Sequence, residues 1–339
     1  MFKNPSNLLF SITLMMGSVI SISANSWLGA WMGLEINLLS FMPLIICLKN
    51  SLSTESALKY YLTQTLGSAI LLFGIMCMSM EINFNFYLTM NYSWIYWVMN
   101  STLMMKMGAA PFHFWFPEMM EGLSWMSSFI LMTWQKIAPM ILLSYCLILK
   151  YVVVISILSI IIGSLGGLNQ ISLRKLMAYS SINHMGWLMS SLMISNFYWI
   201  LYFMVYTFLS WSMISIFKKY NLFLINQLFN LDNFNPMVKI SIFCNMLSLG
   251  GLPPFLGFMP KWILIQSLSI HNKFFVLIMV MFTLITLFFY MRLIYSALMI
   301  NYTSMKWLLF NESNLNLILI FNFFCLVGLP MISLLYWVY

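Results

Sequence analysis

Charged residues are scarce in this chain of 339 residues. They make up 6% of the sequence, whereas hydrophobic residues make up 62% and the mean hydropathy is +0.92. A soluble globular protein carries roughly 25% charged residues, so this composition does not supply a water-facing surface. No small-residue cleavage site follows the first residues, Met-Phe-Lys-Asn-Pro, and we therefore expect no cleaved signal peptide. The composition predicts a chain whose solvent is the lipid bilayer.

Residues that hold metals and redox groups are few and dispersed. The cysteines form no Cys-x-x-Cys pair and have no histidine at ligand spacing; they are Cys47, Cys77, Cys146, Cys244 and Cys325. We interpret them as small apolar residues rather than metal ligands. No histidine pair has haem-ligand character, and no Gly-x-Gly-x-x-Gly motif follows a strand. We therefore expect no metal, flavin, haem or iron–sulfur cluster in this chain.

Arginine is also rare, and the basic residues form no patch. The net charge is +8, but the cations stand in short loops or inside apolar segments, so we expect no nucleic-acid binding. Lysine outnumbers arginine 13 to 2, and there are 33 methionines. Such preferences follow AT-rich codons, and excess methionine suits a mitochondrial code that reads an extra codon as Met. The bias indicates an organelle-encoded protein, although drift and membrane composition can supply part of it.

Eleven stretches are long and apolar enough to cross a bilayer, which takes about 20 residues per helix. They are residues 6–24, 26–48, 56–80, 92–122, 124–149, 151–170, 174–195, 197–217, 238–270, 274–300 and 315–338. The fourth is interrupted at Gly108-Ala-Ala-Pro111 and the ninth at Gly250-Gly-Leu-Pro-Pro254. Proline removes a backbone donor, and a break at membrane depth persists only where protein or a wet cavity satisfies the freed groups. We expect an all-α polytopic membrane protein with two broken helices.

Loop charges predict the orientation of these helices. If the eleven elements alternate, one side receives nine cations: Lys3, Lys49, Lys59, Arg174, Lys175, Lys218, Lys219, Lys239 and Lys306. The other side receives Lys150 and Lys273. Positive loops stay on the inner side. We therefore expect a mitochondrial inner-membrane protein with its N-terminus facing the matrix and its C-terminus facing the intermembrane space.

The two broken helices also suggest an internal symmetry. Residues 1–149 and 150–300 each hold five elements, and the fourth element of each is the broken one. Because five is odd, the second repeat would be inverted relative to the first, with 301–339 as a C-terminal flanking helix. Inverted repeats with matching broken helices are typical of ion pathways in transporters. The alternative is a coincidence of two proline-containing helices.

Apart from charges near the ends of the spans, five charged residues lie inside predicted spans, where each costs at least about 2.5–3.5 kcal/mol on insertion scales. They are Glu35, Lys106, Lys136, Lys261 and Arg292. Burial disfavours a charged lysine and a nearby carboxylate favours it, so a buried lysine can exchange its proton; arginine stays charged. We interpret Glu35 and the three lysines as a proton relay, with Glu35 pairing with Lys106. Structural ion pairing or snorkelling is the alternative, and it is favoured for Arg292, which lies within reach of a helix end.

Two histidines and two glutamates are weaker candidates. His113 lies beside the first break and His184 lies at membrane depth; either can support the relay, but hydrogen-bonded packing is the simpler interpretation. Glu118 and Glu121 close the fourth element, where solvated helix-end charges are favoured over an entrance to a proton path.

Five motifs together resemble one family. They are NSWLGAWMGLEIN at 25–37, KMGAAPFHFWFP at 106–117, TWQKIAP at 133–139, SLRKLMAYSSINHMGW at 172–187 and LGGLPPFLGFMPKW at 249–262. In order and spacing they resemble the chain 2 subunits of NADH:ubiquinone oxidoreductase, respiratory complex I, and look most like the insect members. These are antiporter-like subunits of the membrane arm. Longer antiporter-like members have fourteen helices, and by this resemblance the present chain starts at their fourth.

The resemblance implies a function and a set of partners. It implies proton translocation along a central hydrophilic axis, with Glu35, Lys106, Lys136 and Lys261 at the family's motif positions. It also implies that FMN, the iron–sulfur clusters and the ubiquinone site lie in other subunits. The expected partners are other membrane-arm and accessory subunits, together with lipids such as cardiolipin. A standalone cation/proton antiporter and a purely structural membrane scaffold are the competing readings.

Overall fold

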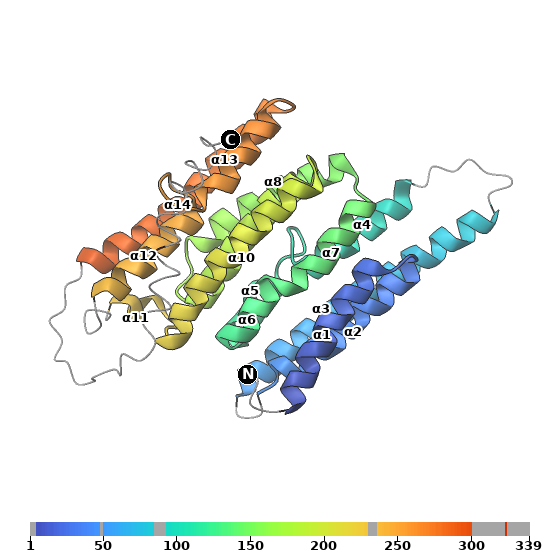
Figure 1. Cartoon of the computed structure of the whole chain (residues 1–339), viewed down its shortest axis with the longest axis horizontal. Helices are drawn as coiled ribbons and strands as arrows, with labels where there is room; N and C mark the ends of the chain where they lie inside the picture. Colours follow the sequence, from blue (N-terminus) through green and yellow to red (C-terminus); the bar gives the residue numbers. More distant parts are fainter. Residues whose placement is uncertain (1–4, 48–49, 85–92, 230–235, 300–322, 324–339) are drawn as a thin grey trace. The chain divides into compact units, whose positions relative to one another are not determined.

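The described fold is helical throughout. A computed structural model describes residues 5–47, 50–84, 93–229, 236–299 and 323 (Figure 1). Beyond its helices, the described chain has one isolated bridge, between Ser172 and Leu224. The helices are α1 (Pro5–Ser23), α2 (Trp27–Ile45), α3 (Ser51–Phe84), α4 (Ser93–Met107), α5 (Trp115–Gly122), α6 (Trp125–Met132), α7 (Trp134–Tyr145), α8 (Leu149–Gly167), α9 (Leu173–Leu192), α10 (Asn196–Lys219), α11 (Ile225–Phe229), α12 (Pro236–Gly250), α13 (Phe258–Ser269) and α14 (Lys273–Met299).

The all-α membrane class predicted from the sequence is confirmed. Within the described residues, seven helical stretches meet the length and apolarity needed to cross a bilayer, one of them α6 and α7 taken together: Pro5–Ser23, Trp27–Ile45, Ser51–Met80, Trp125–Tyr145, Leu149–Gly167, Asn196–Lys219 and Lys273–Leu298. Helix α14 exposes large apolar side chains at alternating spacings of three and four, including Phe274, Leu277, Met281, Leu284 and Phe288. Such a stripe suits contact with lipid.

The predicted count of eleven spans stays a prediction. The first ten predicted ranges coincide with a helix or with a helix in two pieces. The eleventh, 315–338, and most of the predicted flank 301–339 lie outside the described residues.

The chain divides into two compact units, 1–155 and 156–339. In the first unit α1 and α2 form a hairpin, α2 also packs on α3, and α7 contacts α1, α2 and α4 (Figure 1). Two glycines allow the two helices of the hairpin to approach each other closely. A Cβ on Gly33 would lie 2.5 Å from the backbone nitrogen of Ser21, and one on Gly17 would lie 2.9 Å from the backbone nitrogen of Asn37, so a larger residue would not fit at either position. This packing fixes the helix that carries Glu35.

In the second unit α9 forms the centre. Nearly all its residues from Leu176 to Leu192 are buried, and it contacts α10 and α13, while α12 packs on α10 and α14. The stripe of serine, asparagine and histidine in α9 therefore faces protein. Because α9 is surrounded by protein rather than lipid, it does not need the apolarity of a lipid-facing spanning helix, and it does not have that apolarity.

Both predicted helix breaks are confirmed. Helix α4 ends at Met107 and α5 begins at Trp115, with Gly108 between them at φ +72°. Helix α12 ends at Gly250 and α13 begins at Phe258, with Gly251 at φ +84°. Both glycines adopt a left-handed backbone that a side chain disfavours.

A third interruption differs from the sequence prediction of one helix over 124–149. It lies at Thr133, between α6 and α7. The Thr133 hydroxyl donates to the Phe129 carbonyl at 2.8 Å, a back-bond that bends helices. Pro139, inside α7, cannot donate to the preceding turn. Lys136 therefore lies in the first turn of a new helix rather than in the middle of a long one.

Candidate functional site

A small cavity in the first unit brings two of the predicted relay residues together. Lys106 and Lys136 both line it, and its volume is ≈ 20 Å³, counted as space open to the centres of water molecules. About 10–15 Å³ on this measure holds one water. The other lining residues are Leu34, Asn37, Leu38, Tyr60, Gln64, Met107, Trp115, Phe116, Leu131, Gln135 and Pro139.

Lys106 reaches the cavity from the last turn of α4. Its side chain is buried, and its stem packs on α3, where a Cβ on Gly67 would lie 3.4 Å from its Cγ. The Gln64 amide donates to the Lys106 carbonyl at 3.2 Å, which satisfies one of the carbonyls left free at the helix end. A cation in the last turn is favoured by the helix dipole.

Lys136 reaches the same cavity from the N-terminal end of a helix, whereas Lys106 lies at a C-terminal end. Lys136 lies in the first turn of α7, where the helix dipole disfavours a cation. The side chain is 2% exposed, and its Nζ lies 5.2 Å from the centre of the Phe116 ring. An aromatic face attracts an ammonium group. The two lysines therefore meet different electrostatic environments on one cavity.

A hydrogen-bonded chain of uncharged polar groups crosses the cavity wall. The Tyr60 hydroxyl donates to Gln135 Oε1 at 3.4 Å, and Gln135 Nε2 donates to Asn37 Oδ1 at 3.0 Å. These residues come from α3, α7 and α2. These three residues were not identified from the sequence alone. The sequence marks them only as polar residues within apolar helices, although Asn37 is two residues after Glu35 and Gln135 directly precedes Lys136.

Glu35 is half-buried on α2 and does not line the cavity. It interacts electrostatically with Lys106 and with Tyr60, but the described residues contain no ion pair within 4.0 Å that joins Glu35 to Lys106. The predicted functional pair is thus within electrostatic range but not in contact, and it stays a prediction.

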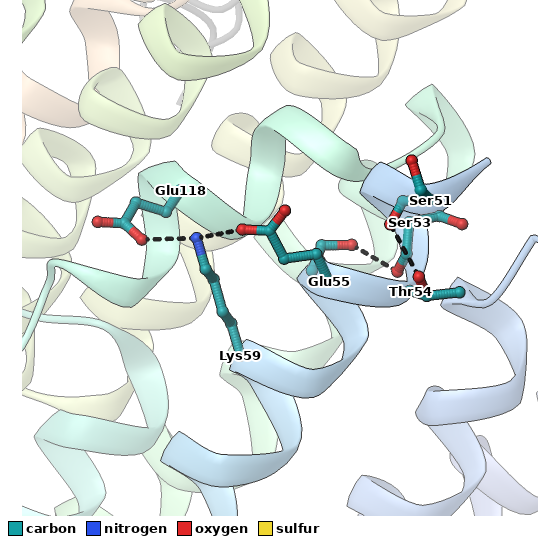
Figure 2. Close-up of polar contacts among 7 residues, drawn as sticks. Ser51, Ser53, Thr54, Glu55, Lys59 and Glu118 are labelled. Atoms are coloured by element: carbon teal, nitrogen blue, oxygen red, sulfur yellow. Dashed lines mark hydrogen bonds and ion pairs between the residues drawn. The ribbon is translucent and has the colours of Figure 1, made fainter.

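A pair of salt bridges lies elsewhere in the first unit, around Lys59. Figure 2 shows Lys59 on α3 between Glu55, one turn earlier, and Glu118 on α5, with both Nζ–carboxylate distances at 3.0 Å. All three side chains are at least 39% exposed, and exposed pairs contribute about 0–1 kcal/mol each. The contact tethers α5, the half-helix after the break, to α3. This fits the helix-end role expected for Glu118.

In the second unit, Lys261 bridges the two halves of the broken helix. Its Nζ, on α13, donates to the carbonyl of Gly250 at 2.8 Å and to that of Leu249 at 3.4 Å, both at the end of α12. The side chain is buried, so these carbonyls replace water around the ammonium group. Gly251 packs directly on it, because a Cβ there would lie 2.9 Å from Lys261 Nζ. The helix break thus forms the site that binds the lysine.

The two histidines are held by local contacts. His184 Nδ1 lies 2.9 Å from the Tyr202 hydroxyl, and its ring centre lies 5.0 Å from that of Tyr206. His113 lies inside the first break, with Nδ1 3.2 Å from the carbonyl of Pro111, and it does not line the cavity of Lys106 and Lys136. These contacts fit hydrogen-bonded packing, and a supporting role of either histidine in the relay stays a prediction.

Arg292 is exposed on α14 and lies on a second, open cavity of ≈ 390 Å³ in the second unit. Asn169, Gln170 and Asn226 also line this cavity. Within the described chain Arg292 forms no salt bridge.

Two family models together match residues 24–336 of the chain. Residues 24–286 match the model described as "NADH:quinone oxidoreductase/Mrp antiporter, TM", and residues 287–336 match "NADH dehydrogenase subunit 2 C-terminus". The NADH-ubiquinone oxidoreductase chain 2 of Anopheles gambiae is 54% identical over 339 residues, which cover 98% of this chain and 99% of the relative. That of Aedes aegypti is 52% identical with the same coverage.

Solved structures share the fold at lower identity. A chain of respiratory complex I from Thermus thermophilus matches with a TM-score of 0.81 and 20% identity, covering 95% of this chain and 77% of that one. A chain of the Mrp complex from Dietzia sp. matches with a TM-score of 0.76 and 16% identity, covering 87% and 61%.

Proposed function

Because this chain belongs to the NADH-ubiquinone oxidoreductase chain 2 family, a family of membrane-arm subunits of respiratory complex I, we propose that Lys106 and Lys136 relay protons through the cavity that they share. The complex oxidises NADH and reduces ubiquinone in other subunits, and this subunit takes part in proton pumping. The shared cavity is the observation that supports the relay most strongly. Glu35 modulates Lys106 from electrostatic range.

Lys261 extends the relay in the second unit. Its ammonium group is held by two backbone carbonyls at a helix break. Half-helix C-terminal ends and unwound carbonyls are where membrane transporters bind cations. Loss of the proton leaves Lys261 an uncharged amine without the charge-assisted attraction to those carbonyls. Protonation of Lys261 is therefore coupled to the contact between α12 and α13.

The test of the relay is Lys136→Arg in the intact complex reconstituted into vesicles. Arginine keeps the positive charge but does not give up its proton. We expect the variant complex to assemble and to reduce ubiquinone, with fewer protons pumped per NADH. A purely structural scaffold needs only the charge, so an unchanged proton yield would support the scaffold and refute the relay. A standalone antiporter would transport cations when purified without partner subunits.

We assign no redox cofactor to this chain. In support, the described residues contain no group of three or more His, Cys, Asp or Glu side chains that could hold a metal ion. FMN, the iron–sulfur clusters and ubiquinone belong to other subunits in this proposal. A metal or flavin bound by this chain in a density map of the complex would contradict it.

The proposed location is the mitochondrial inner membrane, with the N-terminus in the matrix and two inverted five-helix repeats at 1–149 and 150–300. The nine-to-two division of loop cations supports the orientation, and the matching breaks after Lys106 and before Lys261 support the repeats. Labelling of Lys218 and Lys219 from the matrix side is the expected result. Labelling from the intermembrane space would reverse the orientation.

Other complex I subunits are the proposed protein partners, and anionic lipids such as cardiolipin are the proposed lipid partners. The open cavity beside Arg292 supports the lipid, because guanidinium binds phosphate through paired hydrogen bonds and basic pockets between helices on the matrix side bind such headgroups. Arg292→Gln should lower the cardiolipin that the purified complex retains; unchanged lipid content would argue against this site.

A further inference from the structure

The cavity between the two lysines is small, and its polar wall is supplied by residues with no role in the relay so far. Tyr60, Asn37 and Gln64 are nearly fully buried there, and Gln135 is half-buried. Burying an amide or a hydroxyl costs free energy unless it is hydrogen-bonded. A cavity built only to pack helices would carry apolar side chains, so these groups require an explanation.

Gln135 is the centre of this wall. Its carbonyl oxygen accepts from Tyr60 and its amino group donates to Asn37, so the two contacts together fix which end of the amide faces which neighbour. A flipped amide would place its amino group against the Tyr60 hydroxyl and its oxygen against Asn37 Oδ1. Three helices thereby hold one amide, next in sequence to Lys136, in a single orientation.

The fixed amide leaves hydrogen-bonding capacity unused. Gln135 retains a second N–H and a second lone pair on Oε1, and the Tyr60 oxygen retains lone pairs. A buried water makes about three hydrogen bonds to such groups. The volume of ≈ 20 Å³ admits one water on the same measure. The cavity thus matches a single water in both size and polarity.

We propose that Tyr60, Gln135 and Asn37 form a polar clamp that holds and orients one water between Lys106 and Lys136. This inference rests on the proposed relay and adds positioning residues to it. In the transfer, the Lys106 ammonium gives a proton to the water oxygen while the water gives another of its protons to the neutral Lys136 amine. The water is restored, and one positive charge has moved.

The clamp residues do not carry the proton themselves. An amide has no proton to exchange at working pH, and a phenol that kept the transferred proton would become a cation. Their role is orientation, which matters because proton transfer requires donor and acceptor within hydrogen-bond reach. Asn37 joins the clamp to α2, the helix of Glu35. At i and i+2 the two side chains point to different faces, which fits Asn37 lining the cavity while Glu35 does not.

The test uses Gln135→Met in the assembled complex, because methionine keeps the side-chain length and removes both hydrogen bonds. We expect normal assembly and ubiquinone reduction, with a loss of protons pumped per NADH as large as that of Lys136→Arg. The matched control is Gln227→Met, which also removes a half-buried amide that makes two hydrogen bonds: Gln227 Oε1 accepts from the backbone N–H groups of Phe223 at 2.6 Å and Leu224 at 3.2 Å. Gln227 lines neither this cavity nor the one beside Arg292, so Gln227→Met should pump normally.

A second readout reports on the water itself. Infrared difference spectra of the complex in ordinary and ¹⁸O-labelled water should contain an isotope-sensitive O–H band from the clamped water. The band should be absent in Gln135→Met and shifted in Tyr60→Phe, which removes one oxygen and keeps the ring. A merely structural role for Gln135 would not move this band.

The outcomes separate the clamp from the relay. If Lys136→Arg loses protons while Gln135→Met and Tyr60→Phe pump normally with the band unchanged, the clamp is refuted and the relay stands. If Lys136→Arg also pumps normally, both are refuted. If Gln135→Met does not assemble, Tyr60→Phe decides the question alone, since a normal proton yield with an unshifted band overturns the clamp.

Discussion

Gly251→Ala is expected to disable Lys261 without touching it. An alanine at this position must adopt φ near +84°, a left-handed conformation that costs about 1–2 kcal/mol for a residue with a side chain. Its Cβ would lie 2.9 Å from both Cδ and Nζ of Lys261, closer than real Cβ contacts. The lysine must therefore move away from the Gly250 and Leu249 carbonyls. A lost hydrogen bond from a charged donor adds about 1.5–3 kcal/mol, for a total of about 2.5–5 kcal/mol.

The adjacent glycine supplies the control. A Cβ on Gly250 would find its nearest neighbour, a ring carbon of Tyr290, at 3.5 Å, which is ordinary contact, and alanine favours a helix more than glycine does. The assay is the amount of assembled complex and the number of protons pumped per NADH. We expect Gly251→Ala to lower both and Gly250→Ala to leave both unchanged. Equal behaviour of the two variants would refute the proposed coupling between the break and Lys261.

Two further predictions concern the first unit. Glu35→Gln should lower the number of protons pumped per NADH, because Lys106 loses a carboxylate within electrostatic range. The control, Glu118→Gln, removes an exposed carboxylate and should leave this number unchanged. Equal proton yields from the two variants would remove Glu35 from the relay. Gly33→Ala should reduce assembly, since its Cβ would lie 2.5 Å from a backbone nitrogen of α1 and overpacking costs about 1–3 kcal/mol. Gly74→Ala, whose Cβ would make contacts of 3.4 Å or more, is its control, and a thermal-stability measurement that ranks the two alike would contradict the packing argument.

Much of the fold follows from local sequence signals. Long apolar runs predict the helices because the bilayer requires backbone hydrogen bonds to be made within each segment. The breaks at Gly108 and Gly251 were predictable because glycine and proline have specific backbone requirements. The interruption at Thr133 was missed because threonine inside a helix is a weak signal, and its back-bond to Phe129 depends on a side-chain rotamer.

The site was only partly predictable. A charge inside an apolar helix stands out in any sequence, so Lys106, Lys136 and Lys261 could be chosen as candidates. Their surroundings could not be predicted, since Gln135 and Asn37 are 98 residues apart and meet only through helix packing. The carbonyls around Lys261 likewise depend on how the chain turns at Gly251. One sequence indicates where unusual residues occur but not which distant groups satisfy them.

The central claim is that Lys106 and Lys136 act in one proton path through their shared cavity. A double-variant cycle tests it directly, with protons pumped per NADH measured for Lys106→Met, Lys136→Met and the double variant in the assembled complex. If both lysines belong to one path, replacing either one already stops the proton flow along that path. We therefore expect the double variant to lose no more protons per NADH than either single variant. Losses that add in the double variant would show two independent paths and contradict the account.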